Sequence, residues 1–460
     1  MIKNVFEEKN IRNANLPEAW RSQSALDELA DFLQLNWEQR AVFYEDGKIE
    51  SRQQFLTFLG QKAVKTNNYI GTIVFKGEQL NIFPKMFRLD STDDDVSELS
   101  LKHMMHNLVQ WLDYCTKIDY PYVSITSDLD DSTDLRELFV TLYIRYVKNA
   151  LDRGLFYKYE EQTDDCSVIK GKVDLRDYFT RKFPNGQLDK FRCTYSTFEF
   201  DNALNQIIKY TCKILLNEAS KSNQKHIRHI LMKLNEVSDV RCTPHDCDKI
   251  RLSRLHKHYS IVLSMSKMFL LNKTTTYNVN NTESFCFLFP TEVLFEGFIG
   301  GFMQSVLDGA AKVVLQASDA TVFSDVIYAG QSLGKTMRMK HDILVEHKEK
   351  GLFILDTKYK KIDRFEGNPD VRSVVNEEAK SNDIYQVLTY ARTREVGDVY
   401  LLYPLFRYED IEPDNPIGIS TTVSGTDPIN VHLIRLPFVF EDDVETTKQK
   451  LAQVILSIFD

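Results

Sequence analysis

The architecture of the C-terminal part of this chain follows from two neighbouring segments, His341-Asp342-Ile343-Leu344-Val345 and Leu352-Phe353-Ile354-Leu355-Asp356-Thr357-Lys358. The first segment alternates apolar and polar positions around Asp342, and the second is an apolar run. The turn between them is polar and ends in Gly351. This pattern predicts a β-hairpin, whose strands of similar length would bring Asp342 and Asp356 close together.

A pair of neighbouring carboxylates at the mouth of this hairpin predicts a metal site. Two such groups repel each other, and the usual remedy is a hard divalent cation with oxygen ligands. We expect Mg²⁺, with Mn²⁺ as the alternative, held by Asp342, Asp356 and a backbone carbonyl near Thr357. Lys358 projects to the same face as Asp356, because side chains alternate along a strand. There Lys358 can orient or help deprotonate a water molecule and offset the charge of a phosphate group.

The combination of Asp, a gap, and Asp-x-Lys on a buried strand resembles the PD-(D/E)xK nuclease superfamily. Upstream, Thr291 to Ile299 is predicted to begin an amphipathic helix, and the resemblance implies that Glu296 on it assists the metal site. Downstream, Asp383 to Tyr390 predicts a helix with Gln386 and Tyr390 on one face, at i and i+4. In that superfamily, this Gln-x-x-x-Tyr element packs beside the catalytic hairpin and touches DNA.

A competing pattern overlaps this region. Ala329 to Thr336 satisfies a relaxed P-loop pattern, but a P-loop must open a helix whose N-terminal amides bind phosphate. Met337 to Ile343 continues instead with the period-two alternation of a strand, which disfavours nucleotide hydrolysis by this chain. Basic residues of this region and of the hairpin exit are therefore expected to face DNA phosphate, unless they are simply solvated charge: Lys335, Arg338, Lys340 and Lys360.

Composition limits the class of protein. The 460 residues exceed what one hydrophobic core usually organises, so two or three domains are expected. No apolar run is long enough to span a bilayer and the N-terminus lacks a signal sequence, so we expect a cytoplasmic protein without a membrane partner. The seven cysteines, an odd number, favour free thiols in a reducing compartment.

Two other features bear on partners and cofactors. The net charge of −9, with basic residues local to the hairpin, suits a catalytic subunit that another protein delivers to DNA. A second metal site is weakly indicated, because the spacing lacks the paired Cys-x-x-Cys motifs of strong zinc sites. Its candidate zinc ligands are Cys242, His245, Cys247, His256 and His258.

Hydrophobic patterning outside the hairpin predicts further elements. Strands with a turn at Lys76-Gly77-Glu78, helices and a polar linker are expected, and the chain should close with two strands and an amphipathic helix. The expected ranges are a helix at 25–35, a hairpin at 69–85, an acidic loop at 90–95, a helix from 134, a loop and strand region at 154–183, helices within 202–267, a linker at 272–283, strands at 399–405 and 431–439, and a helix at 446–459.

With these elements in place, the chain resembles the McrC family, the nuclease subunits of McrBC-type and LlaJI-type restriction systems. The first sixty or so residues lie outside the resemblance. Its motifs are Tyr69-Ile70-Gly71, Ile82-Phe83-Pro84-Lys85, Gly154 to Tyr159, Ile169-Lys170-Gly171-Lys172, Glu199 to Asn205, Leu294-Phe295-Glu296 and the catalytic set. One departure is His341, where the superfamily often has proline.

The resemblance implies a function and a domain plan. Family members work with an AAA+ GTPase of the McrB type, bind it through the N-terminal half, stimulate its GTP hydrolysis and cut both strands of double-stranded DNA. Asp342 and Asp356 would be metal ligands, Lys358 would position the attacking water, and Glu296 and Gln386 would support the site. We expect a multidomain chain of the α+β or α/β class, with a mixed, β-rich N-terminal partner-docking domain (1–125), a mainly helical domain (126–285) and a C-terminal PD-(D/E)xK restriction-endonuclease-like α/β domain (286–460).

Two alternatives remain open. The chain could be a non-catalytic assembly and activator subunit of an AAA+ ring, which its acidic balance and the large share outside the nuclease-like region would suit. It could also be a free-standing RecB-like DNA exonuclease, which would cleave without a partner.

Overall fold

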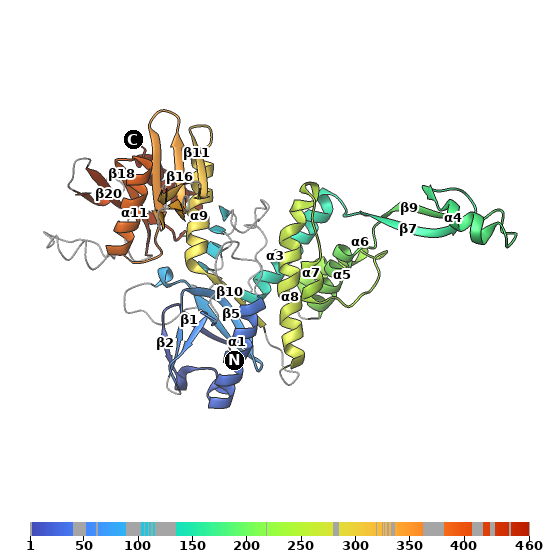
Figure 1. Ribbon diagram of the computed structural model, residues 1–460. Coiled ribbons are helices and arrows are strands. Elements are labelled where there is room, and N and C mark those ends of the chain that lie inside the picture. Colours follow the sequence, from blue (N-terminus) through green and yellow to red (C-terminus); the bar gives the residue numbers. More distant parts are fainter. Residues whose placement is uncertain are drawn as a thin grey trace. The chain divides into compact units, whose positions relative to one another are not determined.

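The computed structural model describes most of the chain and arranges it as two compact units (Figure 1). Unit 1 combines Met1–Leu135 with Thr282–Asp460, and unit 2 is Arg136–Asn281. The residues described are 2–39, 52–60, 63–88, 103–104, 106–108, 110–111, 114–115, 135–217, 219–278, 285–318, 320–323, 325, 327–328, 331–332, 336–361, 381–406, 417–423, 428–440 and 443–459.

The N-terminal part of unit 1 is built on a four-stranded sheet in the order β1-β6-β5-β10. Its strands are β1 (Ile2–Phe6), β5 (Tyr69–Phe75), β6 (Glu78–Phe83) and β10 (Phe285–Pro290). The predicted hairpin is confirmed, and its turn has positive φ angles at Lys76 (51°) and Gly77 (74°). β10 lies so close to β5 that a Cβ at Gly71 would sit 2.0 Å from the carbonyl oxygen of Phe287.

Smaller elements flank this sheet. They are helix α1 (Gln23–Gln39), the 3-10 turn η3 (Lys85–Phe87) and a three-stranded sheet of β2 (Asn10–Arg12), β4 (Ala63–Thr66) and β3 (Leu56–Phe58). The predicted helix around 25–35 is confirmed. Apolar side chains on one stripe of α1 are buried, including Leu29, Leu33 and Trp37, because an amphipathic helix buries its apolar stripe against the core.

The C-terminal part of unit 1 contains a mixed six-stranded sheet in the order β11-β16-β17-β18-β20-β19. The strands β17, β18 and β20 pair in parallel, and the remaining pairs are antiparallel. The strands are β11 (Ala311–Ala317), β16 (His341–His347), β17 (Gly351–Thr357), β18 (Asp398–Leu405), β19 (Ile417–Val423) and β20 (Ile429–Pro437). The hairpin and the two strands predicted near 399–405 and 431–439 are thereby confirmed.

Three of the described helices accompany this sheet, as the patterning predicted. They are α9 (Thr291–Val306), α11 (Ser381–Arg394) and α12 (Val444–Ser457). α11 packs on one face, where Val387 and Ala391 share a buried cluster with Leu344, Ile354 and Val399. α9 contacts β11 through Leu315, which leaves no room for a side chain at Gly300 of the helix.

Unit 2 combines helices with a projecting ribbon (Figure 1). The helices are α3 (Leu135–Arg153), α5 (Ala203–Leu216), α6 (Lys221–Lys233), α7 (Pro244–Asp248) and α8 (Ser260–Asn278), with the 3-10 turn η5 (Arg254–Tyr259). The ribbon consists of β7 (Lys158–Cys166), β9 (Phe191–Glu199) and β8 (Lys172–Val173), with the short turns α4 (Leu175–Asp177) and η4 (Tyr178–Lys182) at its tip. We call residues 158–199 the arm.

The Glu199 to Asn205 motif has a structural explanation in unit 2. The side chain of Asn202 accepts the N–H of Asn205 (3.2 Å) and so caps α5. Both side-chain amides donate to the carbonyl of Phe156, at 3.0 Å from Asn202 and 2.9 Å from Asn205. The motif therefore fixes the start of α5 to the segment that precedes the arm.

The structure corrects one prediction, the polar linker at 272–283. Residues 272–278 of the predicted linker belong to α8, so that prediction is wrong there; polar residues continue a helix at little cost once its buried half has formed. Residues 279–283 and the acidic loop at 90–95 lie outside the described residues. β10 shares a sheet with strands that precede unit 2, and the three-domain division stays a prediction. No described helix combines the length and apolarity that crossing a membrane requires.

Candidate active site

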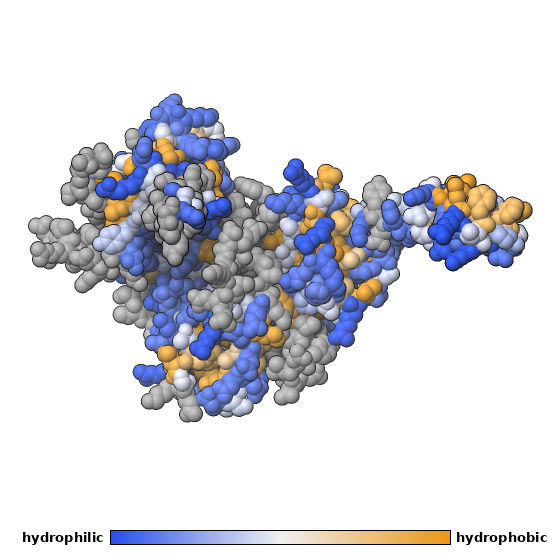
Figure 2. All heavy atoms as spheres, in the orientation of Figure 1, coloured by the Kyte–Doolittle hydropathy of each residue, from blue (hydrophilic) through white to orange (hydrophobic). Residues whose placement is uncertain are grey.

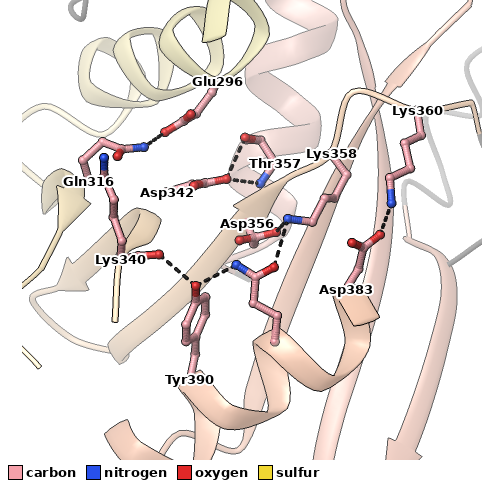
Figure 3. Close-up of polar contacts among 11 residues, drawn as sticks. Glu296, Gln316, Lys340, Asp342, Asp356, Thr357, Lys358, Lys360, Asp383 and Tyr390 are labelled. Atoms are coloured by element: carbon pink, nitrogen blue, oxygen red, sulfur yellow. Dashed lines mark hydrogen bonds and ion pairs between the residues drawn. The ribbon is translucent and has the colours of Figure 1, made fainter. Parts of the chain in front are cut away.

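The predicted hairpin positions the two aspartates. β16 and β17 pair antiparallel with Ile343 opposite Leu355, and the next residues along the two strands are Asp342 and Asp356. One carboxylate oxygen of Asp342 accepts both the backbone N–H and the hydroxyl of Thr357, each at 2.9 Å (Figure 3). These two bonds fix the orientation of Asp342.

Asp356 is almost completely buried, with 1% of its surface exposed. It forms an ion pair with Lys358, and apart from that pair its two oxygens have no hydrogen-bond partner among the described residues. Burial, together with the neighbouring Asp342, raises the pKa of Asp356 to about 7. Burial alone would lower the pKa of Lys358, but the Asp356 carboxylate beside it holds that pKa above its ordinary value.

A chain of hydrogen bonds leads from Lys358 to helix α11 (Figure 3). The Lys358 ammonium lies 3.4 Å from the side-chain oxygen of Gln386. Gln386 donates to the hydroxyl of Tyr390 (2.7 Å), which donates to the backbone carbonyl of Lys340 (2.9 Å). Gln386 and Tyr390 on α11 are therefore hydrogen-bonded to each other, and Gln386 orients the side chain of Lys358.

Glu296 also lies at this end of the sheet. It is on the second turn of α9, and its carboxylate accepts a hydrogen bond from the side-chain amide of Gln316 on β11 (Figure 3). Sequence patterning did not single out Gln316. A glutamine at the end of an amphipathic strand has no distinguishing signal, because its role depends on a backbone conformation that patterning does not show.

The expected DNA-binding residues have different environments. Arg338 and Lys340 are exposed, whereas the ammonium of Lys360 forms an ion pair with Asp383. Tyr390 is buried and its hydroxyl is engaged within the protein. Lys335 lies outside the described residues. Contact of these residues with DNA stays a prediction.

A buried carboxylate, that of Glu7, is hydrogen-bonded to residues that adjoin the site along the chain. Glu7 follows β1, is fully buried, and accepts hydrogen bonds from the hydroxyls of Tyr359 and Thr291, both at 2.6 Å. It also accepts the backbone N–H of Lys85 at 3.0 Å. Tyr359 directly follows Lys358, and Thr291 begins the helix that carries Glu296, so the N-terminal sheet is tied to both elements. Separations of this length along the chain are invisible to local patterning.

The residues at the hairpin suit a hard cation. The partnerless oxygen of the buried Asp356 and the oriented carboxylate of Asp342 are oxygen donors of the kind that Mg²⁺ and Mn²⁺ prefer. No group of three or more His, Cys, Asp or Glu side chains gathers for a metal among the described residues. These residues therefore suit an ion that is coordinated by one or two carboxylates, with carbonyl and water oxygens as its remaining ligands, which is typical of Mg²⁺.

Two other candidate sites from the sequence, a P-loop and a zinc site, find no support in the part of the chain that the structure describes. Within and after the P-loop-like stretch, Gln331–Ser332 and Thr336–Arg338 are strands, whereas a P-loop requires a helix there. Cys242 and Cys247 pack in a cluster with Ile207 and Leu270. Burial raises the pKa of Cys242 to about 11 and that of Cys247 to about 12, and no group of three or more His, Cys, Asp or Glu side chains gathers around them among the described residues.

Comparisons with known proteins identify a family and similar solved structures. Residues 64–404 match the profile of a family described as McrBC 5-methylcytosine restriction system component. A solved structure described as a half-complex of Thermococcus gammatolerans McrB AAA+ hexamers with bound McrC is similar to this chain at 15% identity and a TM-score of 0.66, over 100% of each chain. A cryo-EM structure of the Thermococcus gammatolerans McrBC complex matches at 16% identity and a TM-score of 0.47, over 67% of this chain and 88% of that one. No curated protein sequence matches.

Proposed function

The chain belongs to the family of McrBC 5-methylcytosine restriction system components, and from that premise we propose that it is the Mg²⁺-dependent DNA endonuclease subunit of a GTPase-driven restriction system. The observation that carries the proposal is the convergence of Asp342, Asp356 and Lys358 at the mouth of one hairpin, with Gln386 beside the lysine. Two acids and an ammonium group around one point are the groups that hydrolysis of a phosphodiester needs.

Each residue has a defined task in this proposal. Asp342, which Thr357 orients, and the buried Asp356, whose pKa is raised, would hold the cation. When bound, the cation would stabilise negative charge and lower the pKa of a coordinated water. Lys358, oriented by Gln386, would position the attacking water and offset negative charge as the phosphate is attacked. The carbonyl of Thr357 is the expected third protein ligand.

The bound state of the matched structure suggests the partner. That structure contains McrC with McrB AAA+ hexamers, and we extend this to a McrB-type GTPase as the partner of this chain, which delivers double-stranded DNA to the site. Residues 1–125 stay the docking region proposed from sequence. The described surface offers a second candidate at the tip of the arm, where large apolar side chains gather (Figure 2).

The apolar tip of the arm is unusual for a solvated surface. Six of its side chains are between 55% and 69% exposed: Val168, Ile169, Leu175, Phe179, Phe183 and Leu188. Exposed apolar groups gathered in this way mark interaction surfaces. A subunit that docks on and activates a ring would use such a tip, so the activator role can coexist with the nuclease role.

Site variants in the assembled complex test the nuclease proposal. Asp356→Ala and Lys358→Ala should abolish Mg²⁺-dependent cutting of plasmid DNA, with and without 5-methylcytosine, while stimulation of the partner's GTP hydrolysis persists. Asp308→Asn, an exposed acid in the turn before β11, is the matched control and should cut normally. Cutting that survives both site variants would refute the nuclease assignment and leave the activator role. Cutting without any partner would favour a free-standing exonuclease.

A further inference from the structure

The contact between α9 and β11 contains an irregularity at Gln316. On α9, Glu296 and Gly300 lie one turn apart and so share a face of the helix. Leu315 packs on Gly300, and the amide of the next residue, Gln316, donates to Glu296. Consecutive residues of a regular strand point to opposite faces of the sheet, so both could not reach the same helix without a local change of backbone.

The backbone change is at Gln316 itself. Its φ is 53°, in the left-handed region, which residues other than glycine, asparagine and aspartate rarely adopt. The pairs Leu315 with Ile343 and Ala317 with His341 keep the register on either side, so Gln316 lies opposite Asp342. The conformation is therefore confined to one residue, directly across from a proposed metal ligand.

We propose that Gln316 is a positioning residue of the active site, whose left-handed backbone aims its amide at Glu296 and fixes that carboxylate beside the strand of Asp342. The inference rests on the proposed nuclease function and adds a residue to it. Glycine would adopt this backbone without strain, yet the position carries a long polar side chain. Strain of this kind is tolerated where the aimed group is needed, typically at functional sites.

The discriminating variant is Gln316→Gly, because it relieves the backbone strain and removes the amide together. A purely structural glutamine would show unchanged Mn²⁺ binding after this substitution. A positioning role predicts that stability and metal binding respond differently: the thermal midpoint should be unchanged or raised by about 1–3 °C, whereas Mn²⁺ binding measured by calorimetry should weaken about tenfold, as for lost support of metal ligands. DNA cutting by the assembled complex should fall by a similar factor.

Three further variants sharpen the test. Gln304→Ala removes another glutamine contact between α9 and β11, to the carbonyl of Val313, and should leave Mn²⁺ binding unchanged. Gln316→Asn keeps an amide, tolerates the left-handed region and is one methylene shorter, so it should weaken Mn²⁺ binding even if the glycine variant does not fold. The E296Q/Q316E double variant can re-form the side-chain hydrogen bond but displaces the carboxylate, and it should not recover cutting.

The outcomes separate this inference from the proposed function. If Asp356→Ala abolishes cutting while Gln316→Gly and Gln316→Asn both bind Mn²⁺ and cut as the unmodified protein does, Gln316 has no positioning role and the nuclease assignment stands. Recovery of cutting in the E296Q/Q316E double variant would also overturn the inference. If Asp356→Ala still cuts, the nuclease assignment falls and this inference with it.

Discussion

The carboxylate of Glu7 accepts a 2.6 Å hydrogen bond from the hydroxyl of Tyr359, a residue 352 positions away along the chain and adjacent to Lys358. Burial raises the pKa of Glu7, and the hydroxyl donors Thr291 and Tyr359 and the ammonium of Lys85 oppose that rise. A buried carboxylate needs all of its donors, because an unmet acceptor in the interior is costly. The segment that carries the candidate site and the N-terminal sheet are thus parts of one cooperative structure.

Tyr359→Phe should destabilise the protein by about 1–3 kcal/mol, since it leaves the buried Glu7 carboxylate with one donor fewer. Urea unfolding measures the loss. Tyr385→Phe is the matched control, because Tyr385 is 66% exposed, and it should change stability very little. Equal stability of the two variants would show that the Glu7 contact contributes nothing.

Gly71→Ala should be far more damaging than Gly77→Ala. Both glycines have positive φ (138° and 74°), so both substitutions introduce backbone strain. Only at Gly71 would the added methyl group collide with β10, 2.0 Å from a carbonyl oxygen, whereas nothing lies within 4 Å at Gly77. We expect a loss of about 1 kcal/mol at Gly77 and of several at Gly71, measured by thermal unfolding. Similar losses would contradict the pairing of β5 with β10.

Metal binding should tighten as pH rises through 7. Burial raises the pKa of Asp356 to about 7 from 3.8, so below that pH a proton competes with the cation for this carboxylate. Mn²⁺ calorimetry at pH 6, 7 and 8 should show falling Kd values. Without metal, the free energy of unfolding changes with pH in the opposite direction. The contribution of Asp356 to folding stability is fully present below about pH 4 and is lost as pH rises through 7. A Kd independent of pH would exclude Asp356 as the titrating ligand.

Tyr390→Phe should lower cutting about tenfold by releasing Gln386, which otherwise holds Lys358. Stability should fall by about 1 kcal/mol, because the Lys340 carbonyl loses its donor. Thr389→Val removes a hydroxyl from the exposed side of the same helix and serves as the control for cutting rates. A tyrosine that served only to contact DNA would instead change DNA affinity and leave the single-turnover rate intact.

Phe179→Ser combined with Phe183→Ser should weaken assembly with the McrB-type partner while leaving the chain folded, because both side chains are exposed. Sedimentation velocity of the mixture measures assembly, and circular dichroism measures folding. Leu255→Ser, at an 83% exposed position of the same unit outside the arm, is the control. Normal assembly of the double variant would exclude the arm tip as a docking surface.

Local patterning predicted the elements that carry the site, because period-two and 3.6-residue repeats reflect burial directly. The hairpin, α9 and α11 follow from it, and the spacing of Gln386 and Tyr390 placed both on one helix face. Three features lay beyond its reach. The role of Gln316 follows from one unusual backbone angle, and that of Glu7 from a contact that forms only when distant parts of the chain fold together. Residues 272–278 were expected to be a linker because they are polar, but α8 continues through them past its apolar half.

The position of β10 limits how the chain can be divided experimentally. A truncation that ends with unit 2 would remove β10 and leave β5, still paired with β6 on its other side, with one unpaired edge along a row of buried residues. Exposed edges of that kind recruit other chains and cause aggregation. Loss of activity in such a fragment would therefore report a damaged sheet, and point substitutions in the full-length chain are the sounder way to separate its roles.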